Sequence, residues 1–201
     1  MVSIAILAGG ASRRMGSDKA FLPFLGVPLI QRVIDRVRPL CHECFIIGAP
    51  DDRFNGLGLE VIPDAIPGHN ALGGLYTALI KASNPLVIVL GCDMPFVNEP
   101  LLRRQVEIIE RVKVDAVVPR SRLGEEPLHA VYRRQICAPL VERAIHSGER
   151  RMISWMQWAN IRYLDESIVS QFDPWHLSFE NINTPEDLAR AEDLARQFEG
   201  T

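Results

Sequence analysis

The chain has 201 residues, of which 47% are hydrophobic and 23% are charged. This length and balance favour a single compact domain with enough apolar side chains to form a core. A net charge of −3 argues against a broad nucleic-acid-binding or membrane-binding face, so any anionic ligand needs locally placed Lys and Arg side chains.

Up to residue 119, short apolar runs alternate with segments of helical periodicity. The expected strands are residues 2–8, 44–47, 59–62, 86–90 and 115–119. The expected helices are residues 28–37, 71–82 and 99–112. Continuous apolar runs are typical of strands in parallel sheets that helices cover on both faces. We therefore predict an α/β fold, with a three-layer, Rossmann-like and mostly parallel sheet, helices on both faces and residues 86–90 at its centre.

Beyond residue 119 the pattern is less regular. We expect strands at residues 128–132 and 179–182, a helix at 135–146 and a short helix at 152–158. Thr184 is a typical N-cap, and Pro185 with two acidic residues after it indicates the first turn of a final helix. The sequence contains no repeat or linker, so residues 1–201 are expected to form one domain.

The amino-terminal segment does not resemble a targeting sequence. Residues 1–7 are apolar but only about one strand long, without the basic start and longer apolar stretch of a signal peptide. The longest apolar run, residues 85–90, is too short to span a bilayer. We expect a cytoplasmic protein that binds neither membrane nor nucleic acid.

A glycine pair and three cations follow the first strand. Gly9 and Gly10 allow a tight turn and close approach of a ligand to backbone amides. Arg13, Arg14 and Lys19 add mobile positive charge in the same stretch. The spacing matches neither the Walker A loop nor the GxGxxG motif. The alternative is a strand-to-helix turn with solvated basic residues, but the grouping of cations favours a triphosphate-binding loop.

Asp93 and Asp64 follow predicted strands, and Gly74 lies near the start of a predicted helix. Such positions are typical of ligand contacts in a parallel sheet. Asp93 follows the apolar strand 86–90, where a carboxylate can share Mg²⁺ with phosphate oxygens. The alternative for Asp93 is a cap on the following turn, but phosphoryl chemistry needs a cation, which favours metal binding. Asp64 could equally be a turn former, and Gly74 could serve close helix packing as well as a ligand.

The first loop resembles a known signature. Residues 7–19 match the pattern Leu-Ala-Gly-Gly-x-Ser-x-Arg-Met-Gly-x-Asp-Lys of the molybdenum cofactor guanylyltransferases. Further matching segments follow in the same order, at residues 26–29, 72–75, 92–95 and 181–188. The resemblance implies the fold of the nucleotide-diphospho-sugar transferases. It also implies transfer of GMP from GTP to molybdopterin, with Mg²⁺ as the cofactor and pyrophosphate as the second product.

The resemblance also implies residue roles. The expected catalytic residues are Arg14, Lys19 and Asp93, and Asp93 is the expected ligand of Mg²⁺. The expected nucleotide-binding residues are Leu7, Ala8, Gly9, Gly10, Lys19, Asp64, Gly74 and Asp93. The expected acceptor-binding residues are Arg150, Arg151, Asn181 and Asn183. On this interpretation residues 1–119 form the nucleotide-binding half and residues 120–201 form the acceptor-binding half.

The acceptor side leaves several alternatives open. An Asn on each side of Ile182 would present two amides on one face of the strand predicted at 179–182, or else fix the turn before the last helix. Further polar candidates lie in the second half, and individually each is also explained as an ordinary surface charge: Arg120, Arg122, Arg133 and His129.

Two departures from the family pattern affect the expected base pocket. Gly48 stands where the family often has Asn, and Asn70-Ala71 replace a common Gly-Pro step. Two alternatives to guanylyl transfer stay open: a related nucleotidyltransferase that uses CTP or acts on a sugar phosphate, and a non-catalytic nucleotide-binding or cofactor-binding adaptor. The Ala8-Gly9-Gly10 order favours GTP, since the resemblance to cytidylyl enzymes would call for Leu-Ala-Ala-Gly. We also expect transient contacts with cofactor-delivery proteins or molybdoenzymes.

Overall fold

A computed structural model of the chain describes residues 1–9 and 19–198. One mixed sheet runs through it in the order β10-β7-β9-β6-β1-β4-β5, with β8 paired to β7. The strands of this sheet are β1 Val2–Leu7, β4 Glu43–Ile47, β5 Glu60–Ile62, β6 Leu86–Gly91, β7 Ala116–Ser121, β8 Gly124–Glu125, β9 His129–Arg133 and β10 Ile161–Leu164. The prediction that residues 86–90 form a central strand is confirmed, since β6 lies in the middle of this order.

Parallel pairing dominates the half of the sheet that contains the amino terminus. β1 pairs in parallel with both β4 and β6, and β5 continues the parallel set beyond β4. β9 is antiparallel to β6 and to β7, while β10 is parallel to β7. The predicted three-layer α/β fold with a mostly parallel sheet is thereby confirmed. Every residue of β1 and β6 is buried, which explains their continuous apolar runs.

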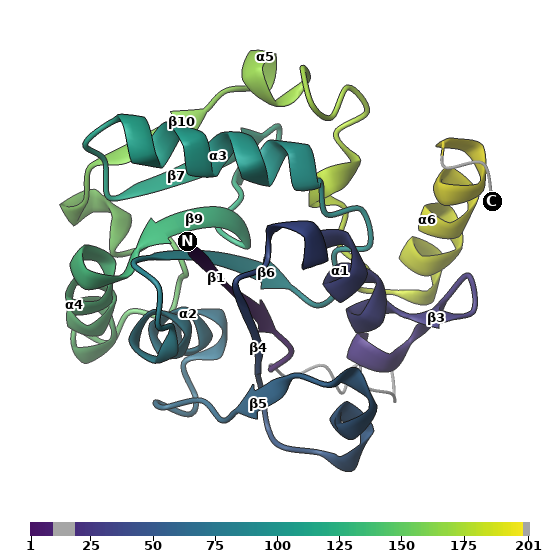
Figure 1. Cartoon of the computed structure of the whole chain (residues 1–201), viewed down its shortest axis with the longest axis horizontal. Helices are drawn as coiled ribbons and strands as arrows, with labels where there is room; N and C mark the ends of the chain where they lie inside the picture. Colours follow the sequence, from purple (N-terminus) through teal and green to yellow (C-terminus); the bar gives the residue numbers. More distant parts are fainter. Residues whose placement is uncertain (10–18, 199–201) are drawn as a thin grey trace.

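Helices cover both faces of the sheet (Figure 1). The helices are α1 Leu29–Val37, α2 Asn70–Lys81, α3 Glu99–Arg111, α4 Arg134–His146, α5 Glu166–Val169 and α6 Pro185–Phe198. Ile4 and Ile6 of β1 pack in the core on the side of α1 and α3, whereas Ala5 and Leu7 pack in the core on the side of α2 and α4. This alternation follows from the two-residue period of a strand. No described helix is long and apolar enough to cross a membrane.

The carboxyl-terminal helix packs on the amino-terminal region. A two-stranded hairpin, β2 Pro23–Phe24 and β3 Val27–Pro28, lies beside α6 (Figure 1). A small separate core joins the two, made of Phe24, Leu29, Phe96, Ile182, Ala191 and Ala195. The backbone N–H of Leu25 also donates to the Glu192 carboxylate at 2.9 Å. Packing therefore holds α6 against the hairpin and the start of α1.

Two predicted elements of the second half need correction. The strand predicted at residues 179–182 is absent: Leu177–Phe179 form the 3-10 helix η6, and residues 180–183 have no regular structure. The Asp173 carboxylate causes this turn by accepting from the N–H groups of Leu177 and Ser178. The helix predicted at residues 152–158 is only the 3-10 helix η5, Met156–Trp158, preceded by turns.

The sequence analysis also missed β10 and α5. Both are short, and β10 lies at the edge of the sheet, where it pairs only with β7. A four-residue edge strand carries little periodic signal of its own. The remaining 3-10 helices are η2 Lys19–Phe21, η3 Arg38–Leu40 and η4 Asp52–Leu57.

Candidate active site

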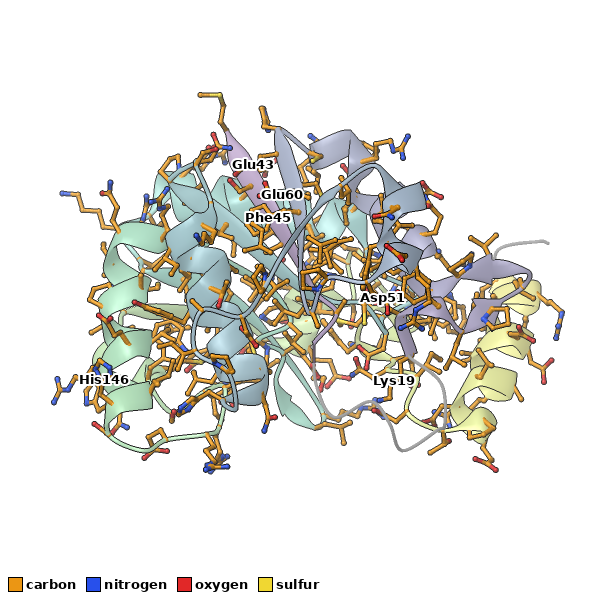
Figure 2. The ribbon with its side chains drawn as sticks, turned by 90° about the horizontal axis from the view of Figure 1, so that it is seen from below. Lys19, Glu43, Phe45, Asp51, Glu60 and His146 are labelled. Carbon is orange, nitrogen blue, oxygen red and sulfur yellow. The ribbon has the colours of Figure 1, made fainter. Side chains whose placement is uncertain are left out.

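The carboxyl ends of the central strands meet at one edge of the sheet. Leu7 lies opposite Gly91 in the β1–β6 pairing and opposite Ile47 in the β1–β4 pairing. Backbone hydrogen bonds extend this edge past the strands, from Cys92 N–H to the Leu7 carbonyl and from Ala8 N–H to the Ile47 carbonyl, at 3.1 and 2.8 Å. Lys19 is at this end of the molecule, opposite Glu43 at the start of β4 (Figure 2).

A cavity of about 90 Å³ opens at this edge. Its lining includes six of the residues predicted to bind nucleotide: Leu7, Gly9, Lys19, Asp64, Gly74 and Asp93. The structure therefore brings together side chains that are up to 86 positions apart, the separation between Leu7 and Asp93. The lining also includes Ile47, Asn70, Ala71, Gly91, Cys92 and Leu128.

Lys19 and Asp93 form the charged part of the cavity. The Lys19 Nζ lies 3.8 Å from Asp93 Oδ2, and the two side chains are only 15% and 21% exposed. Burial raises the pKa of the Asp93 carboxyl, and the neighbouring Lys19 ammonium acts in the opposite direction. A largely buried carboxylate beside a lysine is therefore set at the predicted phosphate-binding edge.

Asp93 is also the described residue best placed to hold a divalent cation. No group of three or more His, Cys, Asp or Glu among the described residues could hold a metal by itself. Mg²⁺ does not need such a cage, because it is usually bound by one or two carboxylates together with substrate phosphates and water. Asp93 lines the cavity and is largely buried, which fits that mode of binding.

The segment before α6 reaches into this site. Lys19 Nζ donates to Asn183 Oδ1 at 2.6 Å, and the Ile182 N–H donates to the Asp93 carbonyl at 3.0 Å. Asn181 instead donates through its side chain to the Phe179 carbonyl. The idea that Asn181 and Asn183 share one face of a strand is thus wrong, because the segment is irregular and the two amides make different contacts.

Asp64 is held by the helix that follows it. The Thr77 hydroxyl, on α2, lies 3.0 Å from Asp64 Oδ1 and accepts from the Ala65 N–H. Burial raises the pKa of the Asp64 carboxyl, whereas the Thr77 hydrogen bond lowers it. This anchoring fixes an acceptor group on the cavity wall.

Of the two departures in the expected base pocket, Asn70-Ala71 has a structural explanation and Gly48 has none. Asn70 has φ of +50°, a backbone conformation that Gly adopts freely and that Asn tolerates better than most residues. Asn70 and Ala71 both line the cavity, so this step keeps its place in the site with different side chains. At Gly48, an added Cβ would lie 3.5 Å from the Ala8 backbone, an ordinary contact distance.

Gly74 serves packing as well as the cavity. A Cβ at Gly74 would lie 3.1 Å from the Leu7 Cδ1, closer than side chains normally approach. α2 therefore comes near to β1 at this glycine, and the same position lines the cavity. Both interpretations of Gly74 from the sequence have a basis in the structure.

The other predicted site residues either lie outside the described part of the chain or are not among the described residues that line the cavity. Gly10, Arg13 and Arg14 lie outside the described residues. Ala8 is next to the cavity and contributes the N–H that bonds to Ile47. Arg150 and Arg151 are exposed and follow α4. His146, the last residue of α4, is toward the same end of the molecule as Lys19 in Figure 2.

The further polar candidates of the second half have other partners. Arg120 pairs with Glu125 and lies over the Tyr163 ring, with 3.7 Å between its guanidinium carbon and the ring centroid. Arg122 pairs with Glu166 on the surface. Arg133 donates to the Val114 carbonyl and lies opposite Leu86, at the amino end of β6. Arg133 is therefore at the wrong end of the sheet for the site.

His129 belongs to the core. Its side chain is fully buried, and its Nε2 accepts from the Asn98 N–H at 3.3 Å. Burial lowers the pKa of the imidazole to about 4. A neutral histidine enclosed in the core cannot contact the acceptor substrate, so its role is structural.

Ile47 and Leu128 are cavity residues that sequence reasoning missed. Both are apolar, and nothing in their local sequence separates them from core residues. Gly91 and Cys92 directly precede Asp93, so their position at the predicted edge could have indicated them.

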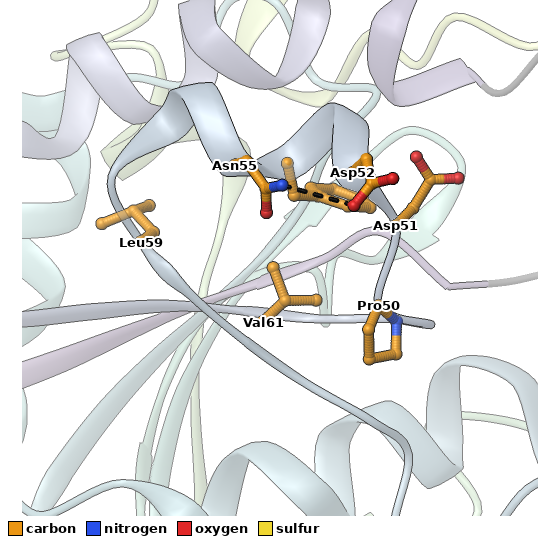
Figure 3. A pocket seen from close by; sticks show the side chains of 7 residues that line it. Pro50, Asp51, Asp52, Asn55, Leu59 and Val61 are labelled. Carbon is orange, nitrogen blue, oxygen red and sulfur yellow. Dashed lines mark hydrogen bonds between the residues drawn. The ribbon is translucent and has the colours of Figure 1, made fainter.

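A larger hollow lies away from this site, at the edge strand β5. Its volume is about 670 Å³, and it is lined by Pro50, Asp51, Asp52, Phe54, Asn55, Leu59 and Val61 (Figure 3). It contains none of the predicted site residues. Its acidic rim is also unsuited to a triphosphate, so the smaller cavity is the better candidate despite its size.

Comparison with known proteins agrees with this geometry. Residues 4–161 match the MobA-like NTP transferase domain. The chain belongs to that family. A molybdenum cofactor guanylyltransferase of Desulfosudis oleivorans is 34% identical over 188 residues, which make up 93% of this chain and 92% of the relative. The relationship of this MobA-like transferase to the guanylyltransferases thus extends over nearly the whole chain.

Comparison with solved structures agrees with this family assignment. Molybdopterin-guanine dinucleotide biosynthesis protein A from Archaeoglobus fulgidus has a TM-score of 0.84 and 30% identity, covering 98% of this chain and 100% of that one. A 2-C-methyl-D-erythritol 4-phosphate cytidylyltransferase from Thermus thermophilus has a TM-score of 0.71 and 20% identity, covering 96% and 98%. The second similarity shows the fold alone. Proteins named for different nucleotides share this fold, so the nucleotide must be argued from the site.

The first prediction concerns Gly91. A Cβ at this position would lie 2.7 Å from Asp93 Oδ1, so Gly91→Ala is expected to displace the Asp93 carboxylate. We expect nucleotidyl transfer to fall roughly 10- to 100-fold, because small displacements of reacting groups cost that much. Gly56→Ala, whose Cβ meets open space, is the control for initial-rate measurements. Equal rates in both variants would contradict the positioning of Asp93 by Gly91.

The second prediction concerns His129. Its pKa is about 4 in the folded protein and near 6.5 when unfolded, so the unfolded chain binds the proton more readily. Above about pH 6.5 this difference in pKa contributes on the order of 3 kcal/mol to the free energy of unfolding. The contribution is lost as the pH falls toward 4. Urea unfolding between pH 7.5 and 4.5 should show a shallower pH dependence for His129→Gln, whereas the exposed-site variant His146→Gln should keep the original slope.

Proposed function

We propose that this chain transfers GMP from GTP to molybdopterin, forming the guanine dinucleotide cofactor and pyrophosphate. The observation that carries the proposal is the Lys19–Asp93 pair, 3.8 Å apart in a cavity at the carboxyl ends of β1 and β6. The names of the relatives that cover nearly the whole chain support the same reaction. Within this fold, ligands bind at the carboxyl ends of the strands.

The chemistry requires little from the protein beyond placement of charge. A phosphate oxygen of molybdopterin attacks the α-phosphorus of GTP, and the bond from that phosphorus to the pyrophosphate oxygen breaks. The attacking phosphate monoester is already largely ionised near neutral pH, since its second pKa is about 6, so no general base is needed. Lys19 and Arg14 hold the triphosphate and offset the charge that develops on the leaving pyrophosphate.

We assign the metal role to Asp93. When Mg²⁺ is bound, it neutralises phosphate charge and steadies the departing group. The Asp93 carboxylate holds this ion together with the phosphates of the nucleotide, a mode of binding that needs few protein ligands. Its burial supports the assignment, because a desolvated carboxylate interacts more strongly with a cation than a solvated one.

We assign the nucleotide to the cavity itself. Leu7, Ala8, Gly9 and Gly10 are assigned to the nucleotide at the end of β1, because the glycines among them allow a ligand to approach the backbone closely. Asp64 and Gly74 also line the cavity and are assigned to contacts with the nucleoside. The Ala-Gly-Gly order and the relatives' names favour guanine over cytosine.

We assign the acceptor to Arg150, Arg151, Asn181 and Asn183. Asn183 is within hydrogen-bond distance of Lys19, so an acceptor beside it is next to the nucleotide phosphates. Residues 1–119 then serve mainly the nucleotide and residues 120–201 mainly the acceptor. This is a division of roles rather than of folding units, because β7 runs through residue 119.

The proposal extends to location and partners. The reaction takes place in the cytoplasm, and the product is handed over through transient contacts with cofactor-delivery proteins or molybdoenzymes. The exposed face around residues 150–151, near the carboxyl end of α4, supplies positive charge for such contacts.

The nucleotide can be tested directly. Incubation with Mg²⁺, molybdopterin and labelled GTP or CTP should give faster transfer from GTP. Separation of labelled dinucleotide from free triphosphate measures both rates. Faster transfer from CTP would contradict the assignment to guanylyl transfer.

The role of Asp93 separates an enzyme from a non-catalytic adaptor. Asp93→Asn should reduce transfer by on the order of 100-fold or more, because the metal-binding charge is lost. The fold should survive, since the substitution removes a buried charge without changing the side-chain shape. Asp193→Asn, at an exposed position on α6, is the matched control. Unchanged Mg²⁺-dependent turnover in Asp93→Asn would refute the metal role.

A further inference from the structure

We propose that Asn183 is a positioning residue of the nucleotide site, whose side-chain oxygen holds the Lys19 ammonium in place for the triphosphate. This inference rests on the proposed function, in that Lys19 is taken to bind GTP. It adds a role on the nucleotide side to a residue assigned so far only to the acceptor. The segment before α6 thereby contributes to GTP binding.

The Lys19 ammonium has enough N–H donors to bind Asn183 and a phosphate oxygen at the same time. An ammonium has three N–H donors and no acceptor. Lys19 Nζ donates to Asn183 Oδ1 at 2.6 Å, whereas its distance to Asp93 Oδ2 is 3.8 Å, longer than a normal hydrogen bond. Asn183 is therefore the close fixed partner, and the remaining donor capacity of Lys19 can serve a phosphate oxygen.

Asp93 cannot hold Lys19 equally well throughout the reaction. Its carboxylate is also the proposed ligand of a divalent cation, which would draw on the same negative charge and repel an ammonium nearby. The Asn183 oxygen is a neutral dipole, so its attraction for Lys19 does not depend on the charge of Asp93. A neutral partner thus keeps Lys19 in place while the metal is bound.

Asn183 is itself held on a fixed backbone. Asp187 Oδ2 accepts from the N–H groups of Asn183 and Thr184, at 3.0 and 2.9 Å, and Thr184 Oγ1 accepts in return from the Asp187 N–H. On the other side, Ile182 donates to the Asp93 carbonyl and packs in the small core beside α6. The capped start of α6 therefore presents the Asn183 oxygen in a set position, which lowers the entropy cost of ordering Lys19.

Asn181 provides a comparison within the same segment. Its side-chain nitrogen donates to the Phe179 carbonyl, two residues back along the chain. It makes no hydrogen bond to Lys19. The two asparagines, one on each side of Ile182, therefore differ in the function they can perform.

The experiment measures binding of Mg²⁺ and GTP by calorimetry in the absence of molybdopterin, so that acceptor binding does not contribute. Asn183→Ala is expected to weaken GTP binding about tenfold, the effect of losing a hydrogen bond to a charged group. Asn160→Ala should stay within about twofold of the original protein, since Asn160 is exposed and its side chain donates only to the Lys113 carbonyl, away from Lys19. Both variants keep the backbone N–H groups that cap α6, so thermal unfolding should be nearly unchanged.

A double-mutant cycle distinguishes a positioning role of Asn183 from a general loss of order in the site. If Asn183 acts through Lys19, the double variant Lys19→Ala/Asn183→Ala should bind GTP as Lys19→Ala does, within about twofold. Independent effects that multiply would overturn the proposal. So would unchanged GTP affinity in Asn183→Ala, or equal losses in both asparagine variants. A wild-type protein that binds no GTP would instead contradict the proposed function itself, before any variant is compared.

Discussion

The parallel pairing of β1 with β6 sets Leu7 opposite Gly91, and this register decides where the charges of the site lie. Both strands are buried along their whole length, so a shift by one residue would turn their side chains to the wrong core. The register is therefore fixed by packing on two faces. As a consequence, Gly9 after β1 and the carboxylate after β6 lie at the same edge, and Lys19 can meet Asp93 there.

The burial of that pair gives the site its chemical character. Inside the protein, charges interact more strongly than in water, and dipoles fixed in advance need no reorganisation when a phosphate arrives. Lys19, Asp93 and Asn183 form such an arrangement, with Lys19 3.8 Å from Asp93 and 2.6 Å from Asn183. A small cavity is compatible with the proposed function, because on that proposal the triphosphate is held mainly by charge and backbone groups at an open edge.

The segment before α6 contributes to the site through Asn183. The MobA-like domain matches residues 4–161, yet Asn183 lies beyond that range and contacts Lys19 near its start. The small core of Phe24, Ile182 and residues of α6 is what brings the carboxyl-terminal segment to this place. Asn70, the first residue of α2, also lines the cavity, and its positive φ is a backbone conformation that Asn tolerates better than most residues.

The sequence alone determined the alternation of strands and helices through residue 119, the central strand β6 and the N-cap at Thr184, because these depend on local periodicity and capping. It also indicated Gly9, Lys19 and Asp93 through chemistry that is local to each loop. Only the tertiary structure decided that Asn183 faces Lys19 while Asn181 does not, that His129 is enclosed, and that residues 179–182 turn instead of pairing. These outcomes depend on contacts between distant segments, such as Asp93 with Ile182, and no pattern within one segment encodes such contacts.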